Sequence, residues 1–209
     1  MERDIILLGG KPGSGKSRLG RELAAELEPG ISAEHLSLGE QVRAIGRGAL
    51  SSYSREVIAH LDSPHPEKPL PDELAYGLVS EALVRADEAH LILLDGYPRY
   101  ASQIESVYEL AIKDERWLDG MIITDTNDEI ALARMLKRNE RNAYRYTKVE
   151  PSQARARLLN YETLTRPAYE EFRARNLPIE VIDTSYSKQT TTNRGLAAVA
   201  YMLIAREVT

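Results

Sequence analysis

The stretch Gly10-Lys11-Pro12-Gly13-Ser14-Gly15-Lys16-Ser17 decides the fold, because it fits the pattern G-x-x-x-x-G-K-[ST]. It follows the apolar run Ile5–Leu8 and precedes a helical pattern at Ser17–Leu27. Glycines in such a turn let backbone N–H groups curl around phosphate oxygens, and the helix directs its positive N-terminus at them. We therefore predict a phosphate-binding loop, with Lys16 on the β- and γ-phosphates of a nucleotide and the Ser17 hydroxyl on Mg²⁺. The alternative is an ordinary glycine-rich turn.

The composition narrows the class of protein. The 209 residues include 27 basic and 32 acidic side chains, a formal net charge of −5. This length suits one domain with a sizeable core, and the mild acidity argues against a general nucleic-acid binder. The chain has no cysteine, so it has no disulfide, Cys-ligated zinc or thiol nucleophile. No apolar run approaches the ~18 residues of a membrane span and no signal-peptide pattern opens the sequence, so we expect a cytoplasmic protein away from membranes. We also expect a monomer.

Short apolar runs alternate with longer helical patterns along the chain. Continuous apolar runs are typical of parallel strands that are covered on both faces, so the alternation predicts an α/β fold with right-handed crossovers. We expect a five-stranded parallel sheet with helices on both faces. The expected strands are Ile5–Leu8, Glu34–Leu38, Leu91–Leu94, Met121–Thr124 and Ile179–Ile182. The expected helices are Ser17–Leu27, Asp72–Asp87, Ala101–Ile112, Asp128–Arg138, Ser152–Arg175 and Asn193–Arg206.

Two stretches interrupt this alternation. Residues 39–70 are too long for a simple connection and end in the proline-rich segment Ser63–Pro71, and residues 139–151 are polar and basic. Long insertions in a compact α/β domain are usually lids or binding loops. We therefore expect a single domain over residues 1–209 that carries two functional insertions.

A stripe of arginines runs through the second insertion and the helix before it. Arg134, Arg138, Arg141 and Arg145 are spaced by 4, 3 and 4 residues, and none has an acid three or four positions away. In a helix they would share one face and repel one another by ~0.2–0.5 kcal/mol per pair, so we expect them to attract an external anion. Beside a phosphate loop, arginines of this kind stabilise a transferring phosphoryl group. A solvated basic face is the alternative.

The second strong strand ends in Asp95-Gly96-Tyr97-Pro98-Arg99. An acid at the end of a buried strand beside a phosphate loop can hold Mg²⁺ through its water shell, although a plain strand-end turn is the alternative. The histidines share no metal-ligand spacing, and we expect them in loops or facing solvent. They are His35, His60, His65 and His90.

The Asp95–Arg99 stretch resembles the D-G-[FY]-P-R signature of nucleoside monophosphate kinases, especially adenylate kinases of the short-lid type. The resemblance covers about residues 5–184. The other segments that are similar to family motifs are Gly10–Ser17 (the phosphate loop), Ser37–Arg43 (S-T-G-[DE]-x-x-R), Pro71–Leu74 (P-D-E-L) and Arg157–Pro167 (R-L-x-x-Y-x-x-x-T-x-P).

The resemblance implies phosphoryl transfer from ATP to a nucleoside monophosphate, with AMP favoured and Mg²⁺ as cofactor. It also implies an acceptor-binding lobe at residues 39–70 and a short lid at 138–151. The implied catalytic residues are Lys16, Arg99, Arg138, Arg145 and Arg157, and Arg141 is the alternative to Arg145 as the lid arginine. The implied ATP-binding residues are Gly10, Pro12, Gly13, Ser14, Gly15, Lys16, Ser17 and Arg134. The implied acceptor-binding residues are Leu38, Gly39, Arg43, Gly96, Arg99 and Gln103, and the implied metal-binding residues are Ser17 and Asp95.

The sequence departs from the family pattern at three places. The lid segment Tyr144–Lys148 lacks the two aspartates of G-R-x-D-D, Leu38 replaces the usual threonine near the acceptor base, and Lys11 stands where small residues are usual. Two other functions stay open at this point: a kinase of another small acceptor, and an ATP-binding sensor with little turnover.

Overall fold

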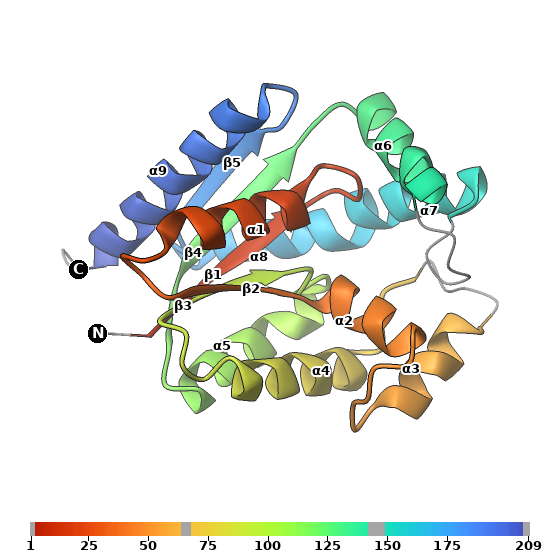
Figure 1. Ribbon diagram of the computed structural model, residues 1–209, viewed down its shortest axis with the longest axis horizontal. Coiled ribbons are helices and arrows are strands. Elements are labelled where there is room, and N and C mark those ends of the chain that lie inside the picture. The colour runs from red at the N-terminus through yellow and green to blue at the C-terminus, as the bar shows by residue number, and fades with distance from the viewer. Residues whose placement is uncertain (1–2, 64–67, 142–148, 207–209) are drawn as a thin grey trace.

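The computed structural model describes residues 3–63, 68–141 and 149–206, with the backbone alone at 139–141 and 206. The described residues form a parallel sheet of five strands in the order β2-β3-β1-β4-β5 (Figure 1). This confirms the predicted sheet. The strands are β1 (Asp4–Gly10), β2 (Ala33–Ser37), β3 (Leu91–Asp95), β4 (Trp117–Asp125) and β5 (Ile179–Asp183).

Helices cover both faces of the sheet, as the alternating pattern predicts. The helices are α1 (Lys16–Leu27), α2 (Leu38–Gly46), α3 (Ser54–Leu61), α4 (Asp72–Arg85), α5 (Ile104–Lys113), α6 (Asp128–Arg141), α7 (Pro151–Asn160), α8 (Arg166–Ala174) and α9 (Lys188–Arg206). A 3₁₀ turn, η1 (Ala101–Gln103), precedes α5. None of the described helices is long and apolar enough to cross a membrane.

The central strand β1 shows why the sheet needs cover on two sides. Its residues are all buried, and successive side chains point to opposite faces. Ile6 and Leu8 pack in one core cluster with α1 and α9, whereas Ile5 and Leu7 pack in the other with α4, α5 and α8. A strand that is apolar at every position is stable only between two helical layers.

The strand register gathers the polar strand ends at one edge of the sheet. Leu8 pairs with Asp95 and Gly10 pairs with Thr124, while Asp125 pairs with Asp183 on β5. The loop after β1 therefore lies at the carboxyl edge of the sheet. On one side of β1 lies β3 and on the other lies β4, and the chain reaches these two strands by crossovers in opposite directions. Ligands of open α/β sheets bind in the crevice at such a point.

The described part of the first predicted insertion, and the helices on either side of the second, lie beyond this edge. Residues 39–70 contain the helices α2 and α3, which the sequence pattern did not predict, and α6 and α7 lie above them on the right of Figure 1, with both chain termini on the left. Met135, Val149 and Ala154 form a small separate core between α6 and α7. The two pairs of helices thus flank the carboxyl edge from opposite sides.

Some predicted boundaries differ from the structure. A π-helical turn, η2 (Tyr161–Thr165), divides the expected helix Ser152–Arg175 into α7 and α8. Strand β4 begins four residues before the expected Met121, because the segment from Trp117 to Gly120 also pairs with β1, with a shift of register between Ile5 and Ile6. Helix α9 begins at Lys188 rather than Asn193.

Gly20 on α1 provides a test of this packing. A Cβ there would lie 2.3 Å from His35 Cδ2 and 2.7 Å from Leu8 Cδ1, both held between the helix and the sheet. Gly20→Ala gains up to ~1 kcal/mol of helix propensity but overpacks the layer by ~1–3 kcal/mol, so we expect a net loss of unfolding free energy in urea titrations. Gly30→Ala is the control, since the nearest atom to its Cβ is 3.4 Å away. Equal stability of the two variants would contradict this account.

Candidate active site

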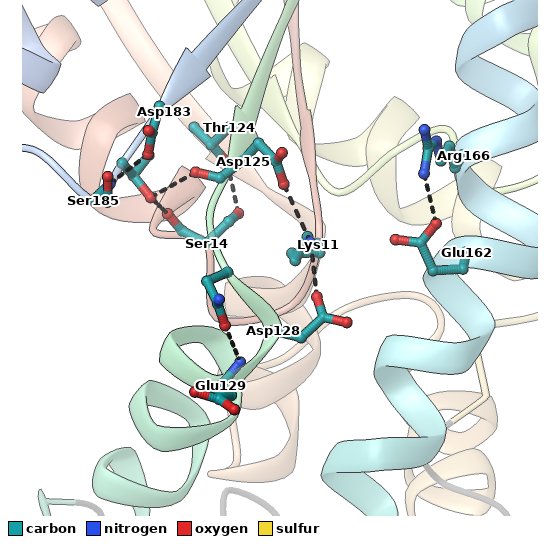
Figure 2. Close-up of polar contacts among 12 residues, drawn as sticks. Lys11, Ser14, Thr124, Asp125, Asp128, Glu129, Glu162, Arg166, Asp183 and Ser185 are labelled. Atoms are coloured by element: carbon teal, nitrogen blue, oxygen red, sulfur yellow. Dashed lines mark hydrogen bonds and ion pairs between the residues drawn. The ribbon is translucent and has the colours of Figure 1, made fainter.

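Hydroxyl groups from two neighbouring strands hold the phosphate loop in place. The Ser14 hydroxyl lies 2.6 Å from that of Thr124, which donates to the Gly9 carbonyl at 3.2 Å, so Ser14 is the donor to Thr124. The Thr184 hydroxyl donates to the Ser14 carbonyl at 2.6 Å. Figure 2 shows Ser14 between Thr124 and the end of β5. Ser14 is therefore a buried anchor of the loop, and its side chain is not turned to a ligand.

The loop also needs glycine at two of its turns. Gly10 has φ +128° and Gly13 has φ +82°, which is the left-handed region. A Cβ on Gly10 would lie 2.2 Å from the Thr124 carbonyl, and one on Gly13 would lie 2.3 Å from the Ala131 carbonyl. The loop is therefore packed closely against the backbone of β4 and α6.

Lys11 ties the loop to the start of α6. Its ammonium lies 2.7 Å from Asp128 Oδ1 and 3.3 Å from Asp125 Oδ1, as Figure 2 shows. Burial would lower the pKa of Lys11, but the hydrogen bonds to the two aspartates raise it above its ordinary value. This pairing gives the unusual lysine at this position a local explanation: it is a clasp between the loop and α6.

Asp95 lies at the bottom of the site, almost wholly buried. It accepts a hydrogen bond of 2.5 Å from the Ser17 hydroxyl, and His35 Nε2 lies 3.3 Å from the same oxygen. Burial alone would raise the pKa of the Asp95 carboxyl, but these two contacts and the Lys16 charge hold it well below its usual range. An ionised carboxylate beside a hydroxyl is a ligand set that suits Mg²⁺.

The position of His35 differs from the prediction. Its side chain is only 4% exposed, on β2 beside Asp95, whereas the sequence analysis expected a loop or solvent-facing histidine. Because the ionised Asp95 can only accept, the His35 Nε2 carries the proton of this hydrogen bond. A histidine in this position fixes the carboxylate that faces the cleft.

Positive charges converge on the phosphate loop. Burial lowers the pKa of the Lys16 ammonium to about 8, although Asp95 attracts its charge. The charges of Arg99, Arg138 and Arg43 repel it and lower the pKa in the same direction. Burial likewise lowers the pKa of Arg43 to about 10, and Arg138 adds to that shift. The group is arranged for a multiply charged anion.

Glycines leave room for two of these arginines. A Cβ on Gly39 would lie 3.2 Å from Arg43 Nη1, and one on Gly96 would lie 3.2 Å from Arg99 Nη2. Arg99 Nε donates to the Gly96 carbonyl at 2.9 Å, which orients the guanidinium. The Arg99 backbone N–H donates to Gln103 Oε1 at 2.7 Å, so the predicted arginine and glutamine are linked directly.

These groups line one cleft of about 790 Å³ at the carboxyl edge of the sheet. Except for Ser14, which lies beneath the loop, every predicted site residue in the described part of the chain lines it. Arg145 and the rest of the segment 142–148 lie outside the described residues, as does the side chain of Arg141. The predicted residues in the cleft are Gly10, Pro12, Gly13, Gly15, Lys16, Ser17, Leu38, Gly39, Arg43, Asp95, Gly96, Arg99, Gln103, Arg134, Arg138 and Arg157.

Several residues that build the site are not among those predicted from the sequence. Tyr169 on α8 is buried, and its hydroxyl accepts the Gly10 N–H at 3.3 Å. Thr184 also accepts a hydrogen bond from Arg134 Nη1 at 3.2 Å, and its carbonyl accepts one from Arg134 Nη2 at 3.0 Å. Tyr161 and Thr165 on the π-helical turn also line the cleft. They are the tyrosine and threonine of the motif noted at Arg157–Pro167, to which no site role was assigned. The signal available for Thr184 was its position directly after a predicted strand.

Comparisons with known proteins agree with this geometry. The chain matches the AAA domain family over residues 9–167. It is 31% identical over 165 residues to a protein named adenylate kinase from Xanthomonas campestris, which covers 78% of this chain and 81% of the relative. A protein of the same name from Stenotrophomonas maltophilia is 30% identical over 82% of this chain and 86% of its own. A third protein named adenylate kinase, from Corynebacterium urealyticum, is 28% identical, and the match covers 84% of this chain and 89% of the relative.

The phosphate loop, the sheet order and the domain match together define a P-loop phosphotransferase. More narrowly, the chain belongs to the adenylate kinase family and is a nucleotide kinase.

The Lys11 clasp can be tested by unfolding. Lys11→Met keeps most of the side chain's length but leaves Asp125 and Asp128 without the ammonium, so we expect a loss of about 0.5–1 kcal/mol of unfolding free energy that shrinks in high salt. Lys113→Met, an exposed lysine at the end of α5, is the control and should be near neutral. A double-mutant cycle with Asp128→Asn measures the coupling, and additive losses would show that the clasp contributes nothing.

Proposed function

We propose that this protein is an ATP-dependent nucleoside monophosphate kinase that transfers the γ-phosphoryl group of ATP to AMP. The observation that carries the proposal is the convergence of Lys16, Arg43, Arg99 and Arg138 on one cleft, with a pKa for Lys16 of about 8. The mutual repulsion of these four cations is relieved when an anion binds between them. Two nucleotides whose phosphate groups meet in the cleft supply that negative charge. The cleft is lined from one chain, so the proposal requires no second subunit.

The donor end of the cleft is assigned to ATP. Backbone N–H groups of the loop and the N-terminus of α1 bind its phosphates, and Lys16 follows the γ-phosphoryl group. Ser17 and Asp95 fit Mg²⁺, the latter through water, because the pKa of Asp95 is held low enough for a full negative charge. When bound, the metal neutralises charge on the donor phosphates. We assign Arg134, which is hydrogen-bonded to Thr184, to contact with the donor nucleotide.

The acceptor end is assigned to the nucleoside monophosphate. Arg43 and Arg99 hold its phosphate, with Gly39 and Gly96 leaving the room that their guanidinium groups occupy. Leu38 and Gln103 line the same cleft, and we assign them to the base of the acceptor. Holding both phosphates in line converts a bimolecular encounter into a positioned one, which is the main contribution a protein can make to this reaction.

Transfer forms a bond between an acceptor phosphate oxygen and the γ-phosphorus, and breaks the bond from that phosphorus to the β-phosphate oxygen. No general base is needed, because the attacking oxygen is already ionised. Arg138, Arg145 and Arg157 neutralise the charge that moves between the two nucleotides. We assign the acceptor-binding lobe to residues 39–70 and the lid to 138–151, whose closure excludes water as a competing nucleophile.

A coupled assay of ADP formation with a panel of acceptors tests the proposal. We expect AMP to have the highest kcat/KM among AMP, dAMP, GMP, CMP and UMP, with dAMP or CMP as the next best substrates. A preference for UMP or GMP would overturn the assignment of AMP. ATP binding without turnover on any monophosphate would overturn the assignment of the activity.

Lys16→Met should lower kcat by roughly 10³-fold or more, because no other ammonium of the loop reaches the transferring group. The pKa of about 8 gives a second readout, since ATP must bind the protonated form of Lys16. ATP affinity of the wild type should fall by up to about tenfold per pH unit above pH 8, and the variant should lose this slope. Binding is measured by calorimetry between pH 7 and 9.5. Near-full activity, or an unchanged pH slope, would contradict the role of Lys16.

Arg99→Lys should raise the KM for AMP by about tenfold or more and lower kcat, because an ammonium cannot replace a guanidinium that binds a phosphate through two N–H groups. The affinity for ATP should stay nearly unchanged. Arg85→Lys, at the exposed end of α4, is the matched control. A defect confined to ATP binding would place Arg99 at the donor end instead.

A further inference from the structure

Gln103 is held at both ends of its amide by groups that can only donate or only accept. It is 2% exposed on η1, and its Oε1 accepts the Arg99 backbone N–H at 2.7 Å. Its Nε2 donates to Asp72 Oδ1 at 2.7 Å. A backbone N–H cannot accept and a carboxylate cannot donate, so both neighbours demand the same orientation of the amide.

The Asp72 carboxylate is itself fixed. Asp72 is the first residue of α4, and its other oxygen, Oδ2, accepts the Ser102 hydroxyl at 2.6 Å. Ser102 and Gln103 are adjacent on η1. Each of the two carboxylate oxygens of Asp72 therefore accepts a hydrogen bond from a different side chain of the same turn. Of the two contacts on the Gln103 amide, the one to the carboxylate is charge-assisted and is the stronger.

The orientation of the Gln103 amide determines which base it can pair with. Adenine presents an acceptor at N1 and a donor at its 6-amino group, whereas guanine presents a donor at N1 and an acceptor at O6. The patterns are inverted. An amide that can rotate by 180° pairs with either base. An amide whose oxygen and nitrogen cannot exchange places pairs with only one of the two bases, because its donor would face the donor of the other base and its acceptor would face the acceptor.

We propose that Asp72 is a positioning residue that locks the Gln103 amide and thereby makes the acceptor site select adenine against guanine; this inference rests on the proposed function, in which AMP is the acceptor. Asp72 does not itself line the cleft. It acts through Gln103, from the side that faces away from the substrate.

Asp72→Asn tests the lock. The asparagine keeps the size of the aspartate but can face Gln103 with either its oxygen or its nitrogen, so the flipped amide is no longer repelled there. We expect the ratio of kcat/KM for AMP to that for GMP to fall by about tenfold or more, with a rise for GMP contributing to the change. A residue that merely supported the fold would lower both values together and leave the ratio in place.

Glu73→Gln is the matched control. It removes the same charge from the same first turn of α4, at an exposed position, and should leave the ratio unchanged. Ser102→Ala removes the hydroxyl that orients Asp72 and should change the ratio in the same direction as Asp72→Asn but by less. This second variant keeps the test valid where Asp72→Asn lowers the yield of folded protein.

The outcomes separate the lock from the proposed function. AMP turnover by the wild type tests the function, and its absence would overturn that function alone. Where the wild type phosphorylates AMP, an unchanged AMP-to-GMP ratio in both Asp72→Asn and Ser102→Ala overturns the lock. An equal change of the ratio in Glu73→Gln overturns it as well, because the effect would then be one of helix charge.

Discussion

The hydrogen bonds that join the phosphate loop to the ends of β4 and β5 are the contacts on which the site depends. Ser14 is bonded through its side chain to Thr124 and through its carbonyl to Thr184, residues 110 and 170 positions away in the sequence. A glycine-rich loop has little conformational preference of its own, so it can hold several amides towards a ligand only if other elements fix it. The sheet supplies that fixation, since its register brings both threonines to the same edge.

The same anchoring explains how a cluster of cations can exist in the folded protein without a ligand. Lys16, Arg43 and Arg138 repel one another, and burial adds a further cost that appears as lowered pKa values for Lys16 and Arg43. A flexible site would relax by turning these side chains to solvent. Here the loop and the helices α2 and α6 hold them, and in the proposed function this unfavourable energy is released when the phosphate groups of the nucleotides bind.

Much of the fold could be predicted from the sequence, because apolar runs and helical periodicity are local signals. The five strands, the loop and most helices were predicted within a few residues. The strand order was not, since the runs of β1 and β3 carry no record of being neighbours. Helices α2 and α3 were hidden in a polar, proline-containing stretch, and the π-helical turn leaves no break in the helical pattern around Tyr161.

The site was predicted unevenly for a related reason. Residues within motifs, such as Lys16 and Arg99, could be found because the chemistry requires them at fixed spacings. His35, Thr184 and Tyr169 could not, since each acts through a contact with a distant segment and none stands in a motif that requires it. Lys11 could be noticed as unusual from the sequence, but its partners Asp125 and Asp128 became visible only with the fold.

In the proposed function, the acceptor end divides base recognition between an apolar wall and a polar group. Leu38 lines the cleft and also belongs to the main core cluster, at 4% exposure, so it is fixed rather than loose. An apolar wall measures size and shape, and purines that differ only in their polar edges fit it equally well. The replacement of a family threonine by Leu38 therefore removes one polar group from the vicinity of the base. The Gln103 amide is then the group that distinguishes hydrogen-bond donors from acceptors on the base. It can do so only if its orientation is fixed. On this proposal, selectivity for the base is decided behind the cleft, where Asp72 and the Arg99 backbone hold that amide.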